Sequence, residues 1–163
     1  MRSRRFVLVA STVLASLALA ATPAFAQDTE EAEETDSATG TTVNVQVQEW
    51  AVVPDTLSAP AGSVTFDVEN VGPEDLHEFV VVSTDLAASD LPTGEDGAFD
   101  EEAEGVQVLG ELEDIEVGAT DSLTLDLEPG HYVLLCNLVE EEDDGTVESH
   151  YQMGMWIDFE VTA

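Results

Sequence analysis

Residues 123–136 have the sequence LTLDLEPGHYVLLC, and this stretch decides the fold class. Leucine alternates with polar residues over 123–127, which is the period-two pattern of a strand with one buried face. Pro129 and Gly130 then mark a turn, and residues 131–136 form an apolar run that ends at Cys136. The stretch therefore predicts two β-strands separated by a turn.

The rest of the chain repeats this pattern. Similar alternation occurs at Val43–Val47, Val64–Val68 and Ile157–Val161, and further strands are expected at Glu78–Val82 and Val106–Leu112. Seven or eight short strands without a long helical period predict an all-β, two-sheet antiparallel sandwich with Greek-key connections. The exception is a long loop at residues 85–105, whose acidic part at 95–104 has room for one short helix.

The N-terminal residues predict export. Residues 1–26 resemble a secretory signal peptide, with three arginines, an apolar stretch over 6–21 and an Ala-Phe-Ala cleavage site at 24–26. The apolar stretch is shorter than the about 20 residues of a membrane span. Residues 27–42 are acidic and lack an apolar period, so we expect a disordered leader, followed by one domain at 43–163. We expect a periplasmic or extracellular protein that is not inserted in the membrane after signal cleavage.

The charge of the chain is strongly one-sided. It has 36 Asp and Glu residues against 3 Lys and Arg, a net charge of −33, and all three basic residues lie within positions 2–5. Nothing in the predicted domain could neutralise phosphate, so nucleic acid is excluded as a partner. The acidity indicates either a solvated, self-repelling surface or a patch that steers a basic redox partner. Its spread along the whole chain favours the first. No calcium loop of EF-hand type is present.

Four side chains indicate a metal site. Cys136 is the only cysteine and has no partner for an intrachain disulfide. With His77, His150 and Met155 it makes up a thiolate, two imidazoles and a thioether, the donor set of a mononuclear blue-copper site. Strand parity places Cys136 on the same face as Tyr132 and Leu134, and gives Met155 the parity of the apolar residues that follow it, so Met155 should point inward. His131 has the opposite parity to Cys136, so we interpret it as a turn residue.

The chain resembles the cupredoxins, a family of blue-copper proteins, over residues 43–163. The residues that carry the resemblance are Asn70-Val71-Gly72, His77-Glu78-Phe79, Leu127–Tyr132, Cys136-Asn137-Leu138 and His150–Met155. The resemblance implies a Greek-key sandwich that binds one copper ion, as Cu(I) or Cu(II), and shuttles single electrons. Carried over by position, it makes His77 and His150 the imidazole ligands, Cys136 the thiolate and Met155 the weak axial ligand.

Several alternatives stay open. Met153 could replace Met155 as the axial donor, and Cys136 could be a plain core residue. His77 could cap a strand, and His150 could lie on a surface loop. Thirteen residues, 137–149, separate Cys136 from His150, which is more than small cupredoxins usually have. The acidic insert at 139–149 can form a hairpin around Asp144-Gly145. Trp50 is expected in the core or at an edge, and Trp156 half exposed near the site.

These observations lead to one functional hypothesis and two rivals. The chain is expected to be an exported, monomeric copper protein that carries electrons to or from a redox partner protein and is not an enzyme. Three histidines are too few for a multicopper oxidase, and no oxyanion motif supports a hydrolase. The rivals are copper storage or delivery with the same ligands, and a metal-free sandwich that serves as an interaction module.

Overall fold

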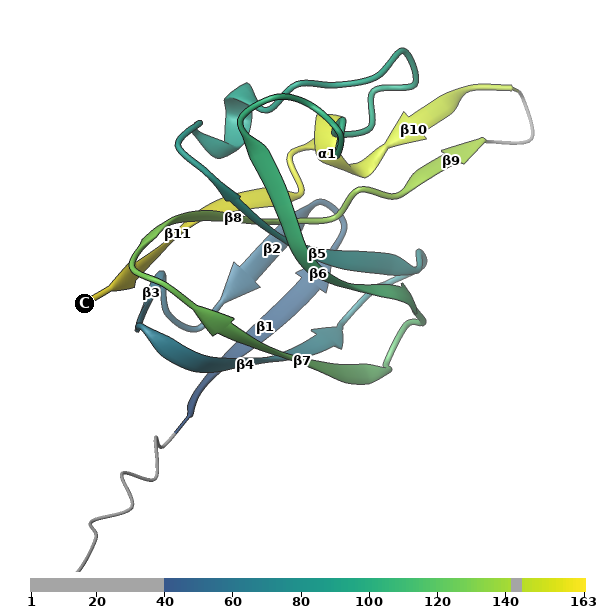
Figure 1. Ribbon diagram of the computed structural model, residues 1–163. Helices are drawn as coiled ribbons and strands as arrows, with labels where there is room; N and C mark the ends of the chain where they lie inside the picture. The colour runs from purple at the N-terminus through teal and green to yellow at the C-terminus, as the bar shows by residue number, and fades with distance from the viewer. Residues whose placement is uncertain (1–39, 142–144) are drawn as a thin grey trace, which may run out of the picture. The chain divides into compact units, whose positions relative to one another are not determined.

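Two β-sheets pack face to face in the computed structural model, which describes residues 40–141 and 145–163 (Figure 1). One sheet has the order β2-β1-β4-β7, made of β2 (Ala51–Pro54), β1 (Thr41–Gln48), β4 (Gly62–Asn70) and β7 (Thr120–Leu127). The other has the order β3-β11-β8-β5-β6, made of β3 (Ser58–Pro60), β11 (Trp156–Thr162), β8 (Gly130–Leu135), β5 (His77–Thr84) and β6 (Val106–Ile115). The predicted all-β sandwich is confirmed.

Three details differ from the sequence prediction. The pairs β1–β4 and β3–β11 are parallel, while the other pairs of the two sheets are antiparallel. The short strands β2 and β3 were not predicted. The first strand begins at Thr41, two residues before the predicted domain start. The predicted signal peptide (1–26) and residues 27–39 of the predicted leader lie outside the described residues.

The acidic insert forms a separate two-stranded hairpin of β9 (Val139–Glu141) and β10 (Val147–Ser149), as expected. It leads directly into α1 (His150–Met153), a single helical turn. In Figure 1 this hairpin extends beyond the two sheets, on the side where α1 lies. No helix among the described residues has the length and hydrophobicity needed to cross a membrane.

The inward faces of the two sheets enclose the main core. Alternate residues of β1 and β4 are fully buried, and Phe66 contacts both Phe79 and Phe159, with ring centroids 5.4 and 5.7 Å apart. Cys136 and Met155 belong to the same cluster. The alternating apolar residues are therefore the buried ones, as predicted, because each strand turns them toward the opposite sheet.

A second apolar cluster covers the outer face of the β5–β8 pair. It contains Val80, Val82, Val133 and Leu135, on which residues of the 85–105 segment and Tyr151 pack. This explains why residues 79–82 form an unbroken apolar run, since that part of β5 is buried on both faces. The segment contains a 3₁₀ turn, η1 (Ala88–Asp90), whereas the prediction allowed a short helix at 95–104, where none forms. The apolar contacts of Ala88 decide the position of the turn.

Candidate metal centre

Three residues that are distant in sequence meet at one end of the sandwich. His77 is the first residue of β5, Cys136 follows the last residue of β8, and His150 is the first residue of α1. All three side chains are fully buried. The Nδ1 atoms of His77 and His150 lie 3.2 Å apart, and the Sγ of Cys136 lies 3.9 Å from the first and 3.3 Å from the second. One sulfur and two nitrogens therefore face a common point, and together they could hold a metal ion.

Hydrogen bonds of the loop that precedes β5 fix the position of His77. The side-chain amide of Asn70 donates to the carbonyl oxygens of Asp75 and Ile115, at 2.9 and 2.8 Å. The Oε1 of Glu49 accepts the backbone N–H groups of Glu74 and Asp75, at 2.8 and 2.7 Å. Burial opposes the ionisation of Glu49, yet these N–H donors hold its pKa below the usual value. Asn70 belongs to one of the stretches that carry the family resemblance, whereas Glu49 was missed.

The short helix α1 positions His150. Its N-cap Ser149 accepts the N–H of Gln152 and donates its own hydroxyl to the carbonyl of Gly97 at 2.8 Å. The N–H of His150 donates to the carbonyl of Leu138 at 3.0 Å, which ties the start of the helix to the chain that leaves Cys136. The start of α1, which carries the imidazole, is thus bonded both to the loop at Gly97 and to the chain at Leu138.

Gly154 ends the helix and brings Met155 back toward the same end of the sandwich. Its φ of 101° lies in the left-handed region, where glycine is favoured. The N–H of Met155 then donates to the carbonyl of His150 at 3.1 Å, and the N–H of Cys136 donates to the carbonyl of Met155 at 2.9 Å. Met155 is fully buried, while Met153 is 46% exposed. Of the two methionines, only Met155 lies in the core with Cys136.

The protonation states suit metal binding. Burial and the neighbouring His150 lower the pKa of His77 to about 4, so its imidazole is neutral at physiological pH. Burial raises the pKa of the Cys136 thiol to about 12. The N–H of Glu78 lies 3.2 Å from the sulfur of Cys136 and stabilises negative charge there. The thiol therefore keeps its proton until a cation takes its place.

Trp50 and Glu140 cover the outer edge of His150. The Trp50 ring meets the imidazole edge-on, with centroids 5.0 Å apart. The Nε2 of His150 lies 3.4 Å from a carboxylate oxygen of Glu140 on β9. Trp50 is remote from His150 in sequence, whereas Glu140 lies ten residues before it in the insert. Neither contact follows from the period of a strand or a helix. The imidazole is completely covered, contrary to the alternative of a surface loop histidine.

His131 lies away from the three donors, as its parity predicts. It is part of β8 rather than a turn, and its Nδ1 is 2.8 Å from the carbonyl of Thr84. Its Nε2 is 3.0 Å from the carboxylate of Asp158. His131 therefore joins β8 to β5 and β11 and does not face Cys136.

Trp156 is half-buried and packs against the second apolar cluster, on the outer face of the β5–β8 pair.

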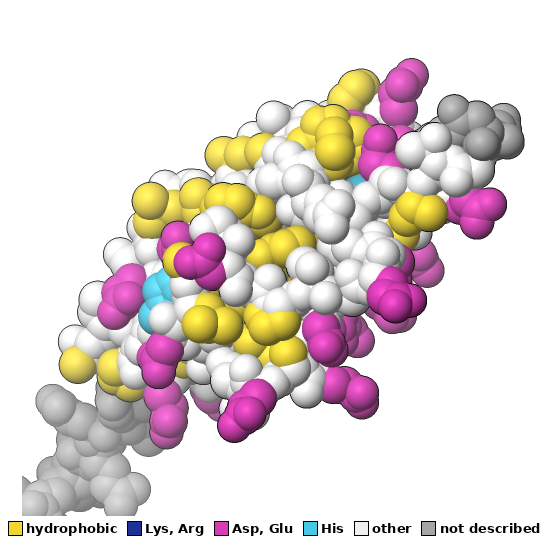
Figure 2. Space-filling view, turned by 90° about the horizontal axis from the view of Figure 1, so that it is seen from above, with side chains coloured by type: hydrophobic (Ala, Val, Ile, Leu, Met, Phe, Trp, Pro, Cys, Tyr) yellow, Lys and Arg dark blue, Asp and Glu magenta, His cyan; other side chains and the backbone are white. Residues whose placement is uncertain are grey.

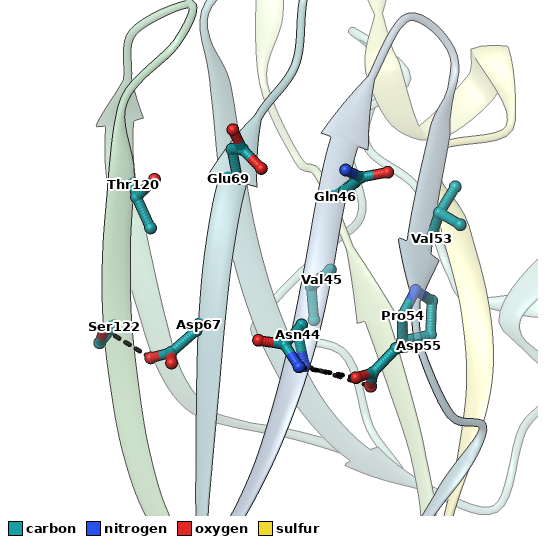
Figure 3. A pocket seen from close by; sticks show the side chains of 10 residues that line it. All are labelled: Asn44, Val45, Gln46, Val53, Pro54, Asp55, Asp67, Glu69, Thr120 and Ser122. Atoms are coloured by element: carbon teal, nitrogen blue, oxygen red, sulfur yellow. Dashed lines mark hydrogen bonds between the residues drawn. The ribbon is translucent and has the colours of Figure 1, made fainter.

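A hollow of about 510 Å³ lies on the outer face of the sheet β2-β1-β4-β7 (Figure 3). Its lining mixes polar and apolar side chains, and two hydrogen bonds cross it, from Asn44 to Asp55 at 2.7 Å and from Ser122 to Asp67 at 2.7 Å. His77, Cys136 and His150 are not among its lining residues. The three donors thus meet inside the protein, apart from this hollow.

A β-sandwich with a buried His-Cys-His cluster at one end has the architecture of the cupredoxins. A profile of the cupredoxin-like domain matches residues 11–147, and the chain belongs to this family. No curated protein sequence matches the chain at a significant level.

Solved structures of blue-copper proteins share the fold. Reduced auracyanin from the photosynthetic bacterium Roseiflexus castenholzii is 20% identical, with a TM-score of 0.51 over 76% of this chain and 98% of that one. Auracyanin A, a "blue" copper protein from Chloroflexus aurantiacus, is 18% identical, with a TM-score of 0.50 over 76% and 99%. Rusticyanin from Thiobacillus ferrooxidans is 15% identical, with a TM-score of 0.50 over 76% and 77%. At these sequence identities, the likeness shows a shared fold and nothing finer.

Proposed function

We propose that the chain binds one copper ion through His77, Cys136 and His150, with Met155 as the axial ligand, and carries single electrons outside the cytoplasm without converting a substrate. The observation that carries this proposal is the convergence of two Nδ1 atoms and one Sγ atom within 3.2–3.9 Å of each other. Bound copper would supply one-electron chemistry between Cu(I) and Cu(II). The shared fold with auracyanin A, a "blue" copper protein, supports this assignment.

The donor set fits copper on chemical grounds. A thiolate with two imidazoles and a weak thioether satisfies both oxidation states, so little rearrangement is needed between them. The neutral His77 imidazole is ready to bind, and the N–H of Glu78 supports the charge of a thiolate. Hydrogen bonds of Asn70, Ser149 and the Gly154 turn fix the backbone segments that carry the proposed ligands. We infer that these supports keep the site rigid during electron transfer.

Titration of the metal-free chain with Cu(II), followed by visible and EPR spectra, tests the proposal. One equivalent should produce an intense thiolate-to-copper band, and Cys136→Ala should abolish it. A colourless Cu(II) adduct would favour storage or delivery, and the absence of copper uptake would favour a metal-free interaction module. Either result would overturn the electron-carrier assignment.

A matched pair of variants tests the axial ligand. Met155→Leu should keep copper binding and raise the reduction potential, because the weak axial sulfur is lost. Met153→Leu makes the same chemical change at a 46% exposed position and should leave the potential unchanged. If Met153→Leu shifts the potential and Met155→Leu does not, the axial assignment is wrong.

A further inference from the structure

Three carboxylates lie near His150, and one of them, Glu140, approaches the edge of the ring that faces away from Cys136. The insert hairpin supplies Glu140 on β9 and Glu148 on β10, and these residues are direct cross-strand partners. The loop before β5 supplies Asp75. One oxygen of Asp75, one of Glu148 and one ring nitrogen of His150 all lie within 4.8 Å of each other. An oxygen of Glu140 lies 3.4 Å from the Nε2 of the same ring.

This arrangement lacks a compensating charge in the protein. Like charges directly opposite each other in a β-hairpin are destabilising, and Asp75 adds a third. No lysine or arginine occurs in the sequence after position 5. Figure 2 shows Asp and Glu side chains over the visible face of the described residues, without Lys or Arg between them. Neutralisation must therefore come from the solvent, as cations or protons.

A buried nitrogen points into the cluster. His150 is fully buried, and its Nε2 makes no well-aligned hydrogen bond among the residues that the structure describes, although an oxygen of Glu140 lies 3.4 Å away. Its Nδ1 faces Cys136 and His77, so Nε2 is the nitrogen on the side of Glu140. A buried polar atom without a well-placed partner is costly, and a bound cation would remove that cost together with the repulsion of the carboxylates. In the metal-free chain Nε2 can bind a cation while the ring proton sits on Nδ1. Occupation of both sites would release this proton to the solvent, so that His150 would bridge the two ions as an imidazolate.

We propose that Asp75, Glu140, Glu148 and the Nε2 of His150 form a second cation site, next to the predicted copper centre. An imidazole nitrogen together with carboxylate oxygens suits a divalent transition-metal ion such as Zn²⁺ or Mn²⁺ better than Ca²⁺, which prefers oxygen ligands alone. Ligands at about 2.1 Å from one ion lie within about 4.2 Å of each other. The ligand atoms of Asp75, Glu148 and His150, which lie within 4.8 Å of each other, need to close by only a small distance.

Hydrogen bonds fix the backbone that carries the three carboxylates. The backbone of Asp75 is fixed on both sides, because its N–H donates to Glu49 and its carbonyl accepts from Asn70. Ladder pairing of β9 with β10 sets Glu140 opposite Glu148. Ser149, the next residue, is the cap of α1 and is bonded to Gly97. The three carboxylates are thus presented by backbone that is held by hydrogen bonds.

Mn²⁺ binding to the full-length, metal-free protein tests the site, with free Mn²⁺ measured by EPR. The titration is run in about 0.5 M NaCl, where the Debye length is roughly 4 Å, so that diffuse attraction to the acidic surface is suppressed. The wild-type chain should bind one Mn²⁺ saturably. Glu148→Gln and Asp75→Asn should each weaken binding at least about tenfold, because each removes a charged ligand.

Two controls make the result decisive. Glu141→Gln removes an exposed acid from the same strand, next to Glu140, and should leave Mn²⁺ affinity unchanged. Cys136→Ser should abolish the copper band but keep Mn²⁺ binding, so failure of the copper assignment and failure of the second site can be told apart. The second site is refuted by unsaturable Mn²⁺ binding, or by equal losses in Glu141→Gln and Glu148→Gln, provided the variants keep the wild-type melting profile.

Discussion

Glu78 offers a direct test of the electrostatics around Cys136. It follows His77 on β5, it is half-buried, and other acidic residues of the site end surround it. Burial, followed by repulsion from Glu101 and Glu111, raises the pKa of its carboxyl from 4.5 to about 7. Near neutral pH this group is therefore partly protonated in the folded chain, although it is ionised in the unfolded one.

The sign and size of the effect on stability follow from linkage. A group whose pKa is raised on folding stabilises the native state below its unfolded pKa, and this contribution is lost as pH rises through the folded pKa. A rise from 4.5 to about 7 corresponds to about 3 kcal/mol at most. Solvent reaches part of the side chain, so we expect about 1–2 kcal/mol to be lost between pH 5 and pH 8.

Glu78→Gln should remove this loss, because glutamine mimics the protonated acid at every pH. The assay is urea unfolding of the metal-free protein at pH 5, 6.5 and 8 in high salt. Glu160→Gln, at an exposed position of β11, is the matched control for the general repulsion of the acidic chain. The reasoning is refuted if the free energy of unfolding falls with pH as steeply in Glu78→Gln as in Glu160→Gln.

Three further predictions concern the aromatic core, His131 and the thiol of Cys136. Phe66→Ala should lower the free energy of unfolding by about 3–5 kcal/mol, because it empties the centre of the aromatic cluster; urea denaturation measures this, and a loss below about 1 kcal/mol would contradict it. His131→Ala should cost about 1 kcal/mol through the lost bonds to Thr84 and Asp158 and leave the Cu(II) spectrum unchanged; a changed spectrum would connect His131 to the site. Copper binding should release the proton of Cys136, whose pKa is about 12, so the apparent affinity should rise with pH; calorimetry in buffers of different ionisation enthalpy counts the protons, and a count of zero would contradict the buried thiol.

Strand parity predicted the inner part of the site. Strand parity put Cys136 on the same face as Tyr132 and Leu134, which the structure shows to be the core face, and the alternation after Trp156 predicted that Met155 points inward. Both predictions depend only on the period of a strand, which tertiary structure rarely overrides when one face is buried. The ligand roles of His77, His150 and Met155 stay predictions, and their burial agrees with them.

The remaining features depend on contacts that sequence does not encode locally. The strands β2 and β3 are short and include Pro54 and Pro60, so they carry no clear alternation. The position of η1 follows from Ala88 packing on the outer face of β5 and β8. The cover over His150 is made by Trp50 from the chain after β1 and by Glu140 from the insert. Such pairings depend on how the sheets assemble.

Because Trp50 contacts His150 edge-on, its fluorescence should report whether the metal centre is occupied. An indole with its ring centre 5.0 Å from a candidate ligand is close enough for a paramagnetic ion to quench its emission. Trp156, the other indole, packs in the outer apolar cluster and supplies a second emitter in a different environment. Replacing Trp156 with Phe would leave Trp50 as the sole tryptophan. With excitation at a wavelength that tyrosine does not absorb, its emission could report occupancy of the centre in dilute samples where the visible band is too weak to detect.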